Sequence, residues 1–151
     1  MALWAGHQLS ERAAPLVLAA APVADLVEGH RMQVSDEGDA VELYMKCLPE
    51  DDGGEYAKAS PAALLPVTFP VLVAYGDDDA DLPPALVSGY CDSARSGSPD
   101  LVREVKIPGA DHFAIVNASS SAWLEHIVPA LAVMIGARWS SDAAGALLGS
   151  P

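Results

Sequence analysis

One short run of residues restricts the fold of this chain more than any other. From Pro70 to Gly76 the sequence reads Pro-Val-Leu-Val-Ala-Tyr-Gly, with no charged residue and no alternation of apolar and polar side chains. A strand of this kind is buried on both faces, as in a parallel sheet that is covered by helices. The run therefore predicts an α/β fold with this strand at its centre.

Two further strands are predicted, one on each side of the central strand along the chain. Residues 15–20 are again apolar. Residues 101–107 mix apolar and charged side chains in near alternation, which indicates a half-exposed strand at a sheet edge. We therefore expect about three parallel strands, near 15–20, 70–76 and 101–107, because helical segments separate the strands as in βαβ units.

Apolar residues at helical spacing predict the helices that flank this sheet. The predicted faces are Ala2, Ala5 and Leu9; then Leu86, Val87, Tyr90 and Ala94; and finally Trp123, Ile127, Leu131, Met134 and Ile135. Pro129 lies inside the last helix. It is expected to kink that helix at a cost of about 3 kcal/mol, because its ring removes a hydrogen bond and clashes with the preceding turn.

The chain is expected to form a single domain. Residues 1–139 make up that domain, and the Ala, Gly and Ser-rich residues 140–151 are expected to be a flexible tail. Residues 27–69 are mostly polar until Ala62, with short helical candidates at 40–47 and 55–59. We interpret 27–69 as an excursion at the edge of the sheet, which we call the excursion below.

Charge and cysteine content exclude several classes of partner. The net charge is -13, from 8 Lys plus Arg against 21 Asp plus Glu, so phosphate backbones and anionic membranes are repelled. No apolar run approaches the roughly 20 residues that span a bilayer. Cys47 and Cys91 lack the spacing of a zinc site and are interpreted as reduced thiols. We expect a cytoplasmic protein with no nucleic acid or membrane partner, no metal and no cofactor.

The candidate site lies at the ends of the last two predicted strands. Asp79 follows the strand at 70–76, and His112 follows the strand at 101–107. Because the carboxyl ends of parallel strands share one rim of a sheet, both side chains should open onto that rim. A carboxylate that faces an imidazole fixes its tautomer and stabilises the imidazolium formed when it takes a proton. The pair is therefore a candidate acid and base.

Neighbouring aspartates leave two alternatives open. Asp78 is next to Asp79 and could take its place, although Asp77, Asp78 and Asp81 are interpreted as a solvated acidic rim. Asp77, Asp79 and Asp81 also match the first three ligand positions of a calcium loop. Such a loop requires glycine where Leu82 stands and glutamate where Ser88 stands.

Other residues with chemical potential have simpler interpretations. The remaining histidines, His7, His30 and His126, are expected on the surface or packed against helices. Trp4, Trp123 and Trp139 are expected in the core. Phe113 either packs beneath its loop or lines an acyl pocket, and the sequence does not separate these interpretations.

Two motifs carry a family resemblance. The string Gly76-x-x-Asp79-x-x-Leu82-Pro83, followed by a helix, a strand and the segment 108–113 (Pro-Gly-Ala-Asp-His-Phe), resembles the carboxyl-terminal half of the α/β-hydrolase fold family. Segments 20–26 and 56–61 are similar to its esterase, arylformamidase and prolyl-oligopeptidase-like branches, and the resemblance covers about residues 1–136. It implies that Asp79 is the catalytic acid and His112 the catalytic base.

The resemblance also concerns what the chain lacks. Members of this family attack with a serine in a Gly-x-Ser-x-Gly turn, and this sequence contains no such motif. The segment 1–5 looks like the helix that follows the nucleophile in the family. The resemblance implies a truncated hydrolase whose full-length form cleaves carboxylic esters, with amides and formamides as further candidates. The chain as it stands is expected to be inactive.

A second hypothesis comes from a different class of protein. An exposed edge of the strand at 15–20 would present unpaired backbone groups and an uncovered apolar face. The chain could then be a non-catalytic interaction module that pairs with another chain, or with a copy of itself, through that edge.

Overall fold

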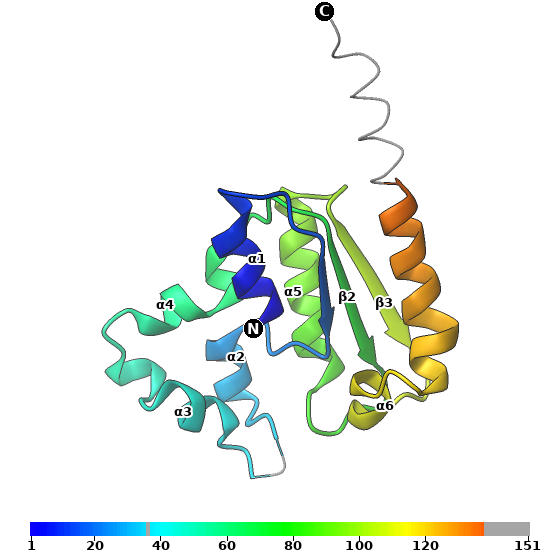
Figure 1. Cartoon of the computed structure of the whole chain (residues 1–151). Helices are drawn as coiled ribbons and strands as arrows, with labels where there is room; N and C mark the ends of the chain where they lie inside the picture. The colour runs from blue at the N-terminus through cyan, green and yellow to red at the C-terminus, as the bar shows by residue number, and fades with distance from the viewer. Residues whose placement is uncertain (36, 138–151) are drawn as a thin grey trace, which may run out of the picture.

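A three-stranded parallel sheet forms the centre of the computed structural model, which describes residues 1–35 and 37–137 (Figure 1). Its strands are β1 (Val17–Ala20), β2 (Val71–Gly76) and β3 (Val102–Ile107), in the order β1-β2-β3. Both pairings are parallel. The prediction of three parallel strands is therefore confirmed, whereas the tail expected at 140–151 lies outside the described residues.

The central strand is buried on both faces. All six residues of β2 are buried. Its side chains alternate, so that Val73 joins the apolar cluster on one face and Leu72 joins the cluster on the other. In β3, Arg103 and Lys106 are exposed, as the alternating sequence predicts for an edge strand.

Helices cover both faces of the sheet (Figure 1). One face packs against α1 (Ala2–Ser10) and α5 (Pro84–Gly97). The other packs against α6 (His112–Val116) and a C-terminal helix (residues 121–137), whose first part is the π-helix η3 (Ala122–Ile127). No helix within the described ranges has both the length and the apolar character that a membrane crossing requires.

The excursion folds beside α1 and β1 (Figure 1). Its elements are α2 (Leu26–Arg31), α3 (Ala40–Met45), η1 (Pro49–Asp51), α4 (Glu55–Ala59) and η2 (Pro61–Leu64). Val34, Val41 and Tyr56 are buried in the same apolar cluster as β1. The few apolar side chains of this polar segment thus extend the core of the sheet.

A polar group on the α5 side links three elements. The Tyr75 hydroxyl of β2 donates to the Glu104 carboxylate of β3, which also accepts from Arg95 Nη2 of α5 at 2.5 Å. Burial alone would raise the pKa of Glu104, but the hydrogen bonds from Tyr75 and Arg95 outweigh it and lower this pKa. The ionised carboxylate therefore fixes α5 against the edge strand.

The face predicted for α1 needs correction, whereas the face predicted for α5 does not. In α1 the buried residues are Leu3 and Gly6, not the predicted face, because Gly6 lies against the ring of Phe69. Trp4, expected in the core, is 37% exposed, and its indole Nε1 donates to the Lys58 carbonyl at 3.0 Å. The face predicted for α5 is confirmed, since Leu86, Val87, Tyr90 and Ala94 are all buried.

The C-terminal helix differs from its prediction in two respects. Ile135 is exposed, whereas Ile127 of the same predicted stripe is fully buried. The segment just before Pro129, Ala122–Ile127, is a π-helix instead of regular α-helix. A π-helical turn is wider than an α-helical turn, and it is one way in which a helix accommodates a proline ring.

We predict that Gly6→Ala destabilises the protein by about 1–3 kcal/mol, because a new methyl group overpacks this contact. A Cβ atom at Gly6 would lie 2.6 Å from Phe69 ring carbons and 2.8 Å from Val17 Cγ2. Gly89→Ala in α5 is the matched control, since nothing lies within 4 Å of its Cβ position. That change should stabilise by about 0.5–1 kcal/mol. Urea unfolding measures both, and equal effects would contradict the packing argument.

Candidate functional site

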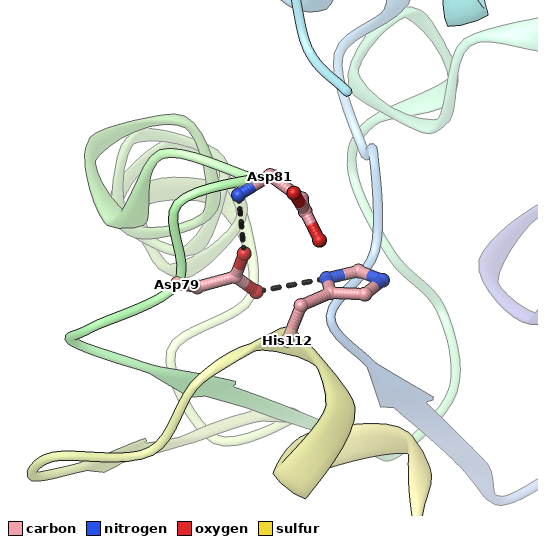
Figure 2. A group of neighbouring side chains, drawn as sticks. All are labelled: Asp79, Asp81 and His112. Atoms are coloured by element: carbon pink, nitrogen blue, oxygen red, sulfur yellow. Dashed lines mark hydrogen bonds and ion pairs between the residues drawn. The ribbon is translucent and has the colours of Figure 1, made fainter. Parts of the chain in front are cut away.

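Asp79 and His112 are in direct contact at the rim where β2 and β3 end (Figure 2). His112 Nδ1 lies 2.9 Å from Asp79 Oδ2. The Asp79 side chain is 1% exposed and that of His112 is 31% exposed. The structure thus brings together the two residues that the sequence places at successive strand ends.

Backbone donors hold the Asp79 carboxylate in place. Its Oδ1 accepts from the Leu82 N–H at 2.8 Å and from the Asp81 N–H at 3.1 Å. A buried carboxylate is tolerated only when its oxygens are hydrogen-bonded. Both oxygens of Asp79 therefore have partners, and the loop before α5 fixes the direction in which Oδ2 points.

His112 is the first residue of α6. The Asp111 side chain caps this helix, since its Oδ1 accepts from the Ala114 N–H at 2.7 Å. Because Nδ1 faces Asp79, the other ring nitrogen, Nε2, points away from the carboxylate (Figure 2). A carboxylate at Nδ1 favours the tautomer with its proton on that nitrogen and leaves Nε2 able to accept a proton.

The two loops that carry the pair meet backbone to backbone. A Cβ atom at Gly76 would lie 1.9 Å from the Ala110 carbonyl oxygen, so only glycine permits this approach. The Asp77 N–H donates to the Ile107 carbonyl at 3.1 Å, and the Asp78 N–H donates to the Ala110 carbonyl at 3.2 Å. These contacts set the separation between Asp79 and His112.

Asp77 has a role that the sequence interpretation missed. Its Oδ1 accepts from the Gly109 N–H at 2.6 Å, although the residue was expected to be only part of a solvated rim. Gly109 has a φ of 67°, the left-handed turn that glycine adopts without strain. The Pro108-Gly109 pair is a turn signal, and a turn next to a strand end needs an acceptor for its N–H.

Asp81 also belongs to the site and not to a solvated rim. Its side chain lies close to His112 and Asp79 (Figure 2), and its carbonyl accepts from the Ser35 N–H of the excursion at 2.9 Å. Asp78, the alternative to Asp79, is exposed, and the imidazole bonds to Asp79 instead. The four neighbouring aspartates of this loop therefore differ in their contacts, and Asp79 bonds to the imidazole.

The same residues define where a metal ion could bind. Among the described residues, the donor atoms of Asp79, Asp81 and His112 lie within 4.8 Å of one another. Asp77 is not in this group, so the arrangement of a calcium loop does not form. Both oxygens of Asp79 already accept hydrogen bonds, and these contacts fit an aspartate and histidine pair.

Within residues 1–35 and 37–137, no serine or cysteine side chain hydrogen-bonds to His112. Cys91 is a free, buried thiol, and burial raises its pKa to about 12, so it is a poor nucleophile. Cys47 is also free. The described part of the chain therefore contains the candidate acid and base, with no serine or cysteine hydrogen-bonded to the imidazole.

The other residues singled out in the sequence lie away from this contact or at its margin. His7 packs edge-on against Phe69 with ring centroids 5.1 Å apart, and burial lowers its pKa. His126 is exposed and His30 is half-buried. Phe113 is 71% exposed, so it does not pack beneath its loop, and its ring lies edge-on to His112. Trp123 is half-buried, and Trp139 lies outside the described residues.

We predict that Asp77→Ala loosens the loop that carries His112 and costs about 0.5–1.5 kcal/mol, the usual net value of a hydrogen bond. The change removes the acceptor of the Gly109 N–H. Asp78→Ala is the matched control, because its exposed side chain lies one position along the same loop. Amide hydrogen exchange at Gly109 should accelerate in the first variant only. Equal protection of the Gly109 amide in both variants would contradict the proposed effect of the Asp77 hydrogen bond on this loop.

Comparisons with known proteins add little to this geometry. No protein-family model and no curated protein matches the chain. The comparison with solved structures found a protein described as a non-heme bromoperoxidase, BpoC, from Mycobacterium tuberculosis H37Rv, with 20% identity and a TM-score of 0.32. The alignment covers 84% of this chain and 51% of that one, so the chain spans about half the length of that structure. A TM-score this low does not establish a family.

Proposed function

We propose that Asp79 and His112 are the acid and base of a hydrolase that cleaves carboxylic esters in a longer form of this protein. The observation that carries the proposal is the 2.9 Å contact between the buried Asp79 carboxylate and His112 Nδ1. Nε2 of the half-exposed imidazole then points away from the carboxylate. The motifs that resemble the α/β-hydrolase family, and their order along the chain, support this proposal.

Each residue has a defined part in the proposed reaction. His112 Nε2 accepts the proton of a nucleophilic hydroxyl as its oxygen bonds to the ester carbonyl carbon, and it then donates this proton to the departing alkoxide oxygen. Asp79 holds the ring through Nδ1 and stabilises the imidazolium that exists between these two transfers. Amides and formamides are further candidate substrates, because transfer of their acyl group to the hydroxyl, with the amine as leaving group, requires the same proton movements.

The nucleophile of the proposed hydrolase is a serine in a Gly-x-Ser-x-Gly turn. This sequence contains no Gly-x-Ser-x-Gly motif. Support comes from the site, where no described serine or cysteine is hydrogen-bonded to His112. We therefore expect that the 151-residue chain is inactive as it stands.

Two assays test the proposal. The purified chain should show no His112-dependent turnover of p-nitrophenyl acetate and no stoichiometric labelling by a fluorophosphonate probe. In a longer form that includes a Gly-x-Ser-x-Gly segment, Asp79→Ala and His112→Ala should each lower kcat at least about 10³-fold, as in other serine hydrolases. Asp78→Ala is the control and should retain full activity. Full activity of His112→Ala would exclude the proposed role.

Association through the free edge of β1 is a second candidate function. In the described part of the chain, β1 pairs with β2 on one side only, because the strand order is β1-β2-β3. The Val17 N–H donates to the Pro70 carbonyl, and the Ala21 N–H donates to the Ala74 carbonyl of β2. Because backbone N–H groups alternate in direction along a strand, those of Leu18 and Ala20 face the side away from β2. An edge of this kind can accept a further strand.

Size-exclusion chromatography with light scattering tests this second function. Pairing of two copies predicts a dimer whose fraction rises with protein concentration. It should also rise with salt, since a net charge of -13 on each copy opposes association and salt screens this repulsion. A monomer at all concentrations and salt levels, with cooperative unfolding, would rule out pairing of two copies.

A further inference from the structure

An apolar cavity of about 330 Å³ lies at the carboxyl end of β1. Its walls come from the start of α1, the segment that leaves β1 and the excursion, including Trp4, Ala20, Val34 and Tyr44. Every lining side chain is uncharged, and the Tyr44 hydroxyl and the Trp4 indole N–H are their polar groups. Trp4 and Tyr44 are 37% and 61% exposed, so solvent and ligands can reach the cavity.

Hydrogen bonds from backbone N–H groups connect the wall of the cavity to the Asp79 and His112 pair. Val34 is part of the cavity wall, and the next residue, Ser35, donates its N–H to the Asp81 carbonyl at 2.9 Å. Asp81 in turn donates its own N–H to Asp79 Oδ1. One stretch of excursion backbone therefore borders the cavity and contacts the loop of the candidate acid.

Backbone strain is concentrated around this cavity. Ala21 lines it with a φ of 44°, and Gln33 and Ser35, on either side of Val34, have φ values of 52° and 88°. Left-handed backbone is strained for a non-glycine residue and persists where the surrounding structure imposes it, often at ligand sites. The Ser35 Oγ is also buried, with no hydrogen-bond partner among the described residues.

We propose that this cavity binds a neutral apolar group, such as an alkyl chain or an aromatic ring system. Its volume is within the range of small-molecule sites, about 300–1,000 Å³, and is about twice that of an apolar cavity that holds benzene. No lining side chain is a cation, and the net charge of -13 opposes anion binding. Sugars and nucleotides would lose hydrogen bonds to water that the few polar lining groups replace only in part.

The location also suggests which part of a substrate the cavity would receive. The cavity and His112 lie at the same end of the parallel sheet, so the cavity would accept the apolar part of the ester. This last step rests on the proposed hydrolase function, whereas binding of a neutral apolar group rests on the cavity alone.

Two fluorescent probes that differ by one charged group test the chemistry of binding. N-phenyl-naphthylamine is neutral, and anilinonaphthalene sulfonate has the same rings with an added sulfonate. Titration of the whole chain should give saturable fluorescence enhancement with the neutral probe and at least tenfold weaker binding of the sulfonate. Equal or tighter binding of the sulfonate would overturn the proposed selectivity.

A matched pair of variants tests the location. Ala40 is an exposed residue of α3 that lines the cavity, and Ala57 is an exposed residue of α4 that does not. Ala40→Leu should fill the cavity and weaken the neutral probe at least tenfold, whereas Ala57→Leu should leave its affinity unchanged. Ala2, in α1, also lines the cavity, and Ala2→Leu should weaken the neutral probe as Ala40→Leu does. It replaces Ala40→Leu in the test if that variant has an altered circular dichroism spectrum.

A competing explanation is adsorption of the probe to the C-terminal helix, where Leu124, Val128 and Ile135 are exposed. Loss of binding in Leu124→Lys, with full binding in Ala40→Leu and Ala2→Leu, would overturn the cavity as the site. His112→Ala separates this inference from the proposed hydrolysis, since it should keep the affinity for the neutral probe. If the hydrolase proposal fails, binding of the neutral probe is still expected. If the probe does not bind, the hydrolase proposal still stands.

Discussion

The contact between Gly76 and the Ala110 carbonyl is the constraint on which the candidate site depends. The loops after β2 and β3 approach so closely that a methyl group at Gly76 would overlap the carbonyl oxygen. Three hydrogen bonds that involve Asp77 and Asp78 hold the loops at this separation. Side chains at the loop tips, Asp79 and His112, are then within 2.9 Å of each other. The close approach of the two loops, held by two backbone hydrogen bonds and by the Asp77 side chain, thus determines the pairing.

Burial of β2 explains why the pair forms at one rim. An uncharged strand must be covered on both faces, so helical layers form on each side and the neighbouring strands run parallel to it. Parallel strands place their following loops at the same end of the sheet. In a chain with a net charge of -13, the one fully buried carboxylate in this loop is stabilised by backbone N–H groups and by an imidazole. Among the described residues, no Lys or Arg forms an ion pair with it.

The sequence predicts those features that depend on a residue's own neighbours along the chain. The three strands, the face of α5 and the meeting of Asp79 with His112 follow from apolar runs and strand ends. It fails where a distant segment decides burial. Gly6 is buried because Phe69 packs on it, which no periodicity of α1 encodes. Asp77 differs from Asp78 only because the Gly109 N–H, 32 positions away, lies within its reach.

The excursion shows how such distant contacts extend the site. Its polar composition suggests a decoration at the sheet edge, yet Val34 is buried beside β1 and Ser35 bonds to Asp81. A series of hydrogen bonds then runs from Ser35 through Asp81 and Asp79 to the imidazole. The wall of the apolar cavity and the loop that carries Asp79 are therefore joined through this backbone. The excursion thus contributes to the surroundings of the candidate pair through a backbone hydrogen bond, which its sequence pattern does not reveal.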